Sequence, residues 1–251
     1  ARKHGPVAVP PNLIAPGSTH ISAAMLNLVT LDQAAVDQVV AAIPGGAPNV
    51  QDIYPLAPLQ QGMLFHHARA EGHDPYVMQA RFAFASQARF DAFAQALRGV
   101  IARHDILRTS VHWEGLAQPL QVVWRHAELA VLTLADPATD RDWIDLTQAP
   151  LIRLLREPAQ ADGTLHATLQ FHHIALDHSA LDVVRQELIA FLTGNGAQLG
   201  AAVPFRDYVA QAVLGVSEAE HEAFFRDMLG DIDEPTLAYG LAQVQGGDSV
   251  H

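Results

Sequence analysis

The sequence predicts an α+β fold, a mixed β-sheet with helices packed on it, from three observations. Segments in which apolar and polar residues alternate, as in half-buried strands, are interleaved with segments whose apolar residues repeat at helical spacing. The 251 residues are 49% hydrophobic and 17% charged, so the chain can form a substantial core and does not resemble a disordered protein. There is no cysteine, which excludes a disulfide scaffold and thiolate catalysis.

Charge and hydropathy narrow the function classes. The net charge of -12 argues against a nucleic-acid-binding surface. The sequence has no apolar run of membrane-spanning length and no signal-type N-terminus, so it indicates neither membrane insertion nor secretion. We therefore expect a cytoplasmic protein.

Residues 1–50 differ from the rest of the chain. The stretch 7–22 is rich in Pro, Gly and Ser, as linkers are. A capping box at 30–33 then predicts a short helix over 34–43, and two glycines at 45–46 predict its end. Two interpretations remain open for this region: a linker that positions a neighbouring domain, or a helix packed on the domain that follows.

The middle of the chain alternates between helix and strand patterns. Pro58 can begin a helix that runs to about Ala70, because a proline in the first turn loses no needed hydrogen bond. The expected strands are 77–85, 107–113, 120–124, 130–134, 151–156 and 165–171. The further expected helices are 90–102, 180–192, 205–214 and a last one that begins at a capping box, 217–220, and ends near Gly230.

Two adjacent histidines, His172 and His173, end the last expected strand, and Asp177 follows at the start of a helix. Neighbouring strand residues point to opposite faces, so one histidine should face the core and the other a cleft. A histidine titrates near neutral pH and can move a proton during catalysis, but a purely structural role remains the alternative. We expect no metal site, because adjacent strand histidines diverge and cysteine is absent.

The run 172–178, His-His-Ile-Ala-Leu-Asp-His, resembles the HHxxxDG motif of condensation domains from nonribosomal peptide synthetases, which belong to the chloramphenicol acetyltransferase-like superfamily. Residues 54–67 resemble the opening motif of that family, and residues 103–109 resemble its RHxxLRT motif. The resemblance implies a chloramphenicol acetyltransferase-like N-terminal lobe over 51–233. It also implies that 1–50 joins an upstream carrier domain and that 234–251 extends toward a second lobe.

The resemblance implies amide formation between two thioester substrates carried on phosphopantetheine arms. The partners would be upstream and downstream peptidyl carrier domains and a second lobe of the same domain, and the lobe would bind no cofactor of its own. His173 would manage the proton, and His172 would face inward and hold the turn. Asp177 would be a structural acid paired with Arg103 or Arg108. His178 stands where the family usually has glycine, and we expect packing rather than new chemistry from it.

A second histidine cluster, with His66, His67 and Asp74, resembles the HH[I/L]xxxxGD motif of dual epimerization/condensation domains. The match is partial, because Ala68 replaces the aliphatic residue and His73 occupies the glycine position. The resemblance implies epimerization of the donor α-carbon before condensation. Helix-ending polar residues that complement the helix dipole explain part of the same pattern. Two other function classes stay open: a CoA-dependent acyltransferase and a non-catalytic docking lobe.

Overall fold

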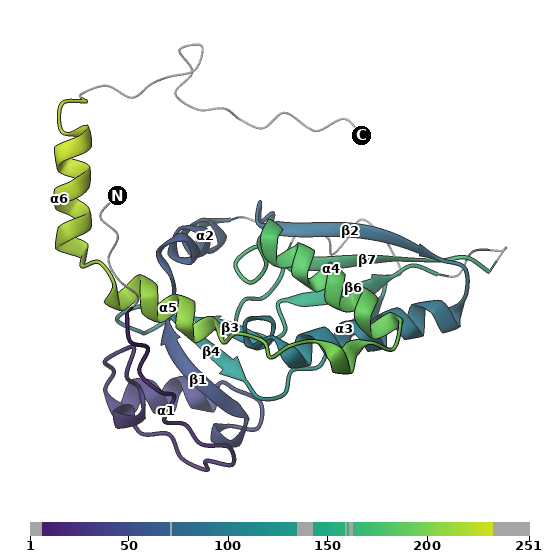
Figure 1. Ribbon diagram of the computed structural model, residues 1–251, viewed down its shortest axis with the longest axis horizontal. Coiled ribbons are helices and arrows are strands. Elements are labelled where there is room, and N and C mark those ends of the chain that lie inside the picture. The colour runs from purple at the N-terminus through teal and green to yellow at the C-terminus, as the bar shows by residue number, and fades with distance from the viewer. Residues whose placement is uncertain (1–6, 71, 135–142, 159, 161–162, 233–251) are drawn as a thin grey trace.

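The computed structural model describes residues 7–232 except 71, 135–142, 159 and 161–162, and it shows two β-sheets with helices packed against them (Figure 1). The strands are β1 (Val50–Pro55), β2 (Val77–Phe84), β3 (Thr109–His112), β4 (Leu120–Trp124), β5 (Ala130–Thr133), β6 (Ile152–Arg156) and β7 (Leu165–His172). The α-helices are α1 (Gln33–Ala41), α2 (Pro58–Arg69), α3 (Gln87–Arg103), α4 (His178–Leu192), α5 (Phe205–Leu214) and α6 (Glu218–Leu229). The predicted α+β class is confirmed.

The four-stranded sheet has the order β2-β7-β6-β5, and it is mixed because β5 runs parallel to β6 while the other neighbours are antiparallel. Helices α3 and α4 run along this sheet (Figure 1). Their apolar faces share one buried cluster with it, in which Leu97 of α3 and Leu154 of β6 are fully buried. The apolar side chains that recur at helical spacing in α3 therefore form the main core of the lobe.

The three-stranded sheet has the order β1-β4-β3 and is antiparallel throughout. Its core includes side chains from the N-terminal segment, so this segment packs on the lobe and does not run free as a linker. The buried residues of this cluster from the segment are Ile14, Ile21, Leu26, Val29, Val36, Val39, Ile43 and Ala47. A role in positioning a neighbouring domain stays a prediction.

Several local expectations need correction. Helix α1 is capped by Asp32, whose carboxylate accepts from the Ala35 N–H at 2.8 Å, so the cap lies two residues after Thr30. The expected strand 107–113 is a 3-10 helix, Asp105–Arg108, followed by β3, because Asp105 and Thr109 close a hydrogen-bonded turn. Strand β1 was not predicted, because its polar and apolar residues do not alternate regularly.

Helix α6 ends the described region on the C-terminal side. The capping box of α6 is present, with the Ser217 side chain accepting from the Glu220 N–H. Helix α6 projects away from the sheets (Figure 1). The segment 234–251, expected to be extended, lies outside the described residues.

Among the described residues, no helix combines the length and the apolar character needed to cross a membrane.

Candidate active site

The adjacent histidines lie at the junction between β7 and α4. Strand β7 ends at His172, which pairs with Val77 at the start of β2, and α4 begins at His178. The side chain of His172 is fully buried, whereas His173 is half-buried. The alternation of strand side chains thus separates the two rings into different environments.

The ring of His172 has one assignable tautomer. Its Nδ1 accepts the Ile174 N–H at 3.0 Å, so Nδ1 carries a lone pair and the neutral ring has its proton on Nε2. Nε2 lies 2.9 Å from Asp74 Oδ2 and donates to it. Burial lowers the pKa of His172, against the opposing effect of Asp74. His172 is therefore a neutral hydrogen-bonding group inside the lobe, held to the turn that follows β7.

Asp74 joins the two histidine clusters. Its Oδ2 accepts from His67 Nδ1 at 2.5 Å as well as from His172, and its Oδ1 accepts the Tyr76 N–H at 2.8 Å. Burial alone would raise the pKa of Asp74, but the hydrogen bonds from His67, the Tyr76 backbone and His172 together lower it. A buried carboxylate is therefore ionised at neutral pH.

The two neighbouring histidines of α2 differ from each other. His67 is 2% exposed and its ring stacks on Trp143, with ring centroids 4.1 Å apart. His66 is exposed, and its ring centroid lies 5.9 Å from that of Tyr76. Of the three residues of the second motif, the structure brings His67 and Asp74 together with His172, and leaves His66 at the surface.

His67, Asp74 and His172 could in principle hold a metal ion, since one ligand atom of each lies within 4.8 Å of the others. The hydrogen bond from Ile174 to His172 Nδ1 opposes this, because it leaves the proton on the nitrogen that would have to bind the metal. Hydrogen bonding explains the cluster without an ion.

His173 lines a cavity of about 290 Å³. Other lining residues are mostly apolar and include Leu59, Met63, Ile106, Leu176, Phe205 and Tyr208. The His173 Nδ1 lies 2.9 Å from the Leu176 carbonyl oxygen, and a carbonyl can only accept, so Nδ1 carries the proton. The lone pair of the neutral ring is therefore on Nε2, which suits His173 to accept a proton from a bound group.

Asp177 does not form the predicted ion pair. Its exposed carboxylate accepts from the Ala180 N–H at 2.7 Å and caps the N-terminus of α4. Arg103 instead pairs with Glu187, with 3.0 Å between Nε and Oε2. Arg108 donates to the Trp124 carbonyl and to the Gln51 side chain.

The reason for this correction is geometric. Asp177 immediately precedes α4, where free backbone N–H groups provide the nearest donors. Glu187 lies further along α4, where that helix packs against α3, and so reaches Arg103. The non-glycine residue His178 is the first residue of α4 and is exposed.

Two residues that support the site were not singled out from the sequence. Gln60 is buried, donates to the Ile174 carbonyl at 2.9 Å, and exchanges amide hydrogen bonds with Gln121. Tyr76 accepts the His173 N–H on its carbonyl oxygen at 2.8 Å. Gln60 lies within the motif-like stretch 54–67, and this motif could have pointed to it. No sequence pattern pointed to Tyr76.

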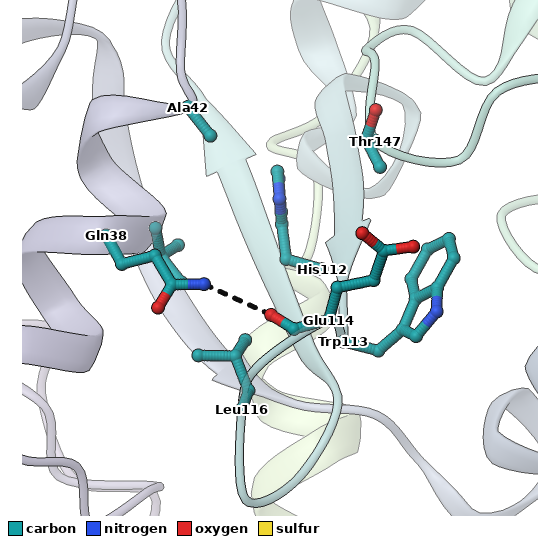
Figure 2. A pocket seen from close by; sticks show the side chains of 8 residues that line it. Gln38, Ala42, His112, Trp113, Glu114, Leu116 and Thr147 are labelled. Carbon is teal, nitrogen blue, oxygen red and sulfur yellow. Dashed lines mark hydrogen bonds between the residues drawn. The ribbon is translucent and has the colours of Figure 1, made fainter.

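A second cavity, of about 180 Å³, lies between α1, the end of β3 and the loop that follows β3 (Figure 2). Figure 2 shows the Gln38 amide, which donates to the Glu114 carbonyl at 3.1 Å, together with His112 and Thr147. Since the site residues predicted from the sequence are not among those that line it, the cavity beside His173 is the candidate active site.

The mixed sheet with helices packed on it agrees with the chloramphenicol acetyltransferase-like fold, and similar solved structures support this fold. The condensation domain from Monacolin K polyketide synthase MokA aligns with a TM-score of 0.55 at 18% identity, over 77% of this chain and 45% of that chain. The starter condensation domain of rhizomide synthetase aligns with a TM-score of 0.57 at 18% identity, over 74% of this chain and 50% of that one.

Residues 50–236 match the family model described as "Condensation domain", and this chain belongs to the condensation-domain family of nonribosomal peptide synthetases. It is 44% identical to malpinin synthetase of Mortierella alpina over 98% of its length, and 32% identical to a linear gramicidin synthase polypeptide of Brevibacillus parabrevis over 83%. The chain spans only 3% of each of these relatives.

Proposed function

We propose that this lobe takes part in amide formation during nonribosomal peptide synthesis. The amine of an acceptor aminoacyl thioester attacks the carbonyl carbon of a donor acyl or peptidyl thioester. The C–S bond breaks, the thiol of the donor carrier leaves, and the amine loses a proton. Both substrates arrive on the phosphopantetheine arms of carrier domains, so we propose no cofactor bound by the lobe itself.

The observation that carries this proposal is the environment of His173. The imidazole lines a mostly apolar cavity, and the Leu176 carbonyl holds its proton on Nδ1. The Nε2 lone pair can then accept a hydrogen bond, or the proton itself, from the attacking amine. Orientation of the amine alone can lower the barrier by several kcal/mol.

The test uses the natural polypeptide that carries this chain, with donor and acceptor loaded on phosphopantetheine carriers and amide detected by mass spectrometry. We expect His173→Ala to abolish amide formation with little loss of stability, because the ring is only half-buried. His221→Ala, an exposed change on α6, is the matched control and should leave the rate unchanged. Full activity of His173→Ala would refute the assigned role.

We further propose that the donor α-carbon is epimerized before condensation. The support is the partial match of the second histidine cluster and the position of Tyr76, whose ring is near a histidine of each cluster. Its centroid is 5.9 Å from that of His66 and 6.4 Å from that of His173. An exposed imidazole at His66 could remove the acidic α-proton from one face of the donor thioester, and a second donor, such as solvent water, would return a proton to the opposite face.

The epimerization test follows the α-proton in D₂O. We expect the wild type to introduce deuterium at the donor α-carbon and to incorporate the inverted residue. His66→Gln and His67→Ala should lose both. Condensation of an L-configured donor without α-proton exchange by the wild type would leave plain condensation as the function.

The alternatives give different results in the same assay. A CoA-dependent acyltransferase would use the donor as a CoA thioester without a carrier, and a docking lobe would retain carriers but make no amide with any donor. We favour condensation over docking because both motif histidines, His172 and His173, are present and His173 lines a mostly apolar cavity.

A further inference from the structure

We infer that Asp74 is a positioning residue for His173, acting through Tyr76 and His172. The inference rests on the proposed function, because it concerns the group to which proton transfer was assigned. It adds that the second histidine cluster serves condensation itself, in addition to any role at the donor α-carbon.

The first connection runs through Tyr76. The Asp74 Oδ1 accepts the Tyr76 N–H at 2.8 Å, which places the start of β2. The Tyr76 carbonyl in turn accepts the His173 N–H at 2.8 Å. The rings of Tyr76 and His173 are nearly parallel, at 14°, with centroids 6.4 Å apart. Asp74 therefore places the backbone that holds His173 and the aromatic ring that flanks it.

The second connection runs through His172. Because Asp74 Oδ2 accepts from Nε2, the other nitrogen of that ring is free to accept the Ile174 N–H at 3.0 Å. Ile174 lies in the turn that also presents the Leu176 carbonyl, the acceptor that sets the tautomer of His173. Asp74 thus influences both the position of the His173 backbone and the turn that holds the His173 ring.

Only a carboxylate satisfies these three donors. Asp74 receives ring N–H groups from His67 and His172 and a backbone N–H from Tyr76, all within 2.9 Å. An asparagine has the same shape, but its amide nitrogen would present hydrogens to one of these donors. Asp74→Asn is therefore a change of hydrogen bonding at nearly constant volume.

The activity experiment separates positioning from epimerization by supplying a donor that is already D-configured. Epimerization is then unnecessary, so a residue needed only for that step becomes dispensable. We expect Asp74→Asn in the natural polypeptide to condense the D-configured donor with kcat lowered about 100-fold, as small misplacements of catalytic groups can cause. The KM for the acceptor carrier should change little, because Asp74 is 1% exposed. Wild-type kcat with this donor would overturn the inference.

Tyr76 provides a second, milder variant in case Asp74→Asn folds poorly. Tyr76→Phe keeps the flanking ring and both backbone hydrogen bonds, so we expect a smaller loss of kcat than in a variant without the ring. Tyr76→Leu removes the ring, and we expect a roughly tenfold loss. Equal rates for Tyr76→Phe and Tyr76→Leu would count against positioning by the ring.

A spectroscopic readout makes the inference independent of activity. In the 251-residue chain labelled with ¹⁵N-histidine, NMR should show His173 protonated at Nδ1 and His172 at Nε2. Asp74→Asn should change both signals, whereas Asp37→Asn on the exposed face of α1 should change neither. If the wild type makes no amide, the proposed function fails, but the NMR comparison still tests whether Asp74 positions His173. An unchanged His173 signal in Asp74→Asn would refute it.

Discussion

Each of the two sheets is associated with a buried polar network, and the two networks are built from different chemistry. At the four-stranded sheet, Asp74 accepts from two imidazoles and a backbone N–H. At the three-stranded sheet, Asp52 on β1 pairs with Arg206 on α5, with Nη1–oxygen distances of 3.0 and 2.8 Å. The first network contains an imidazole, His172, whose pKa burial lowers, and the second keeps a guanidinium charge at every physiological pH.

The Asp52–Arg206 network ties three parts of the chain together. Arg206 also donates to the Pro10 carbonyl at 3.1 Å and to Asn27, both in the N-terminal segment. Burial raises the pKa of Asp52, against the lowering effect of Arg206. Since α5 contributes Phe205 and Tyr208 to the cavity of His173, this ion pair holds one part of the cavity wall to the N-terminal segment.

The difference teaches what each network contributes. A permanent ion pair between elements distant in sequence holds those elements in place, and its hydrogen bonds do not depend on which nitrogen carries a proton. A carboxylate between two histidines also determines the tautomer of each ring. We therefore expect changes in the Asp52–Arg206 network to act mainly on stability, and changes in the Asp74 network to act on stability and catalysis together.

The largest expected effect is on stability, from Arg206→Ala. Removing one partner of a buried ion pair leaves an uncompensated charge and costs about 3 to 5 kcal/mol of unfolding free energy. Urea denaturation measures this. Arg185→Ala, which breaks the exposed pair with Asp182, should cost at most about 0.5 kcal/mol. Similar costs for the two variants would contradict the structural role of the Asp52–Arg206 network.

The next effect is the stability cost of Asp74→Leu. It leaves the ring donors of His67 and His172 and the Tyr76 N–H without their acceptor, which should cost about 3 kcal/mol. His66→Leu, an exposed neighbour of this network, should change stability by no more than about 0.5 kcal/mol. A stable Asp74→Leu protein would mean that water or other groups satisfy the three donors.

A smaller effect is expected at Asp177. Asp177→Ala removes the N-cap of α4 and should cost about 1 kcal/mol, while Asp177→Asn keeps a capping oxygen and should be nearly neutral. Thermal unfolding measures both. If the alanine and asparagine variants lost several kcal/mol alike, a charge-dependent role such as the ion pair first expected would have to be reconsidered.

The smallest effect follows from mild acidification. The pKa of His172 and the pKa of His112 are both lowered by burial from the ordinary value of 6.5, so the folded state binds fewer protons than the unfolded state. Their stabilising contribution is present above pH 6.5 and is lost as the pH falls below it. Between pH 7.5 and 6.5, each histidine should lower stability by at most about 0.4 kcal/mol.

Denaturation midpoints across this pH range, compared between the wild type and His112→Gln, measure the effect. The variant should show a weaker decline, whereas the exposed change His221→Gln should follow the wild type. A steeper decline in His112→Gln would show that the folded state does not exclude the proton at this position.

Local patterns were enough to predict most of the fold. The periods of α3, α4 and β7 were readable because amphipathic spacing reflects which side of one element faces a core, and Pro58 indicated the start of α2. The alternation of strand side chains also predicted that His172 and His173 lie in different environments, and the capping box placed the start of α6. The N-cap of α1 was misplaced, because Thr30 and Asp32 offer competing caps within three residues.

Tertiary structure alone decided the partners of the site. Asp74 meets His172, 98 residues away, because the antiparallel register sets Val77 opposite His172 and so brings the start of β2 beside the end of β7. Glu187, and not Asp177, meets Arg103 because the packing of α4 on α3 selects it. The sequence by itself determined the family and the periodic elements. Strand register and helix packing, which arise from contacts between distant segments, decided which polar groups share a hydrogen bond.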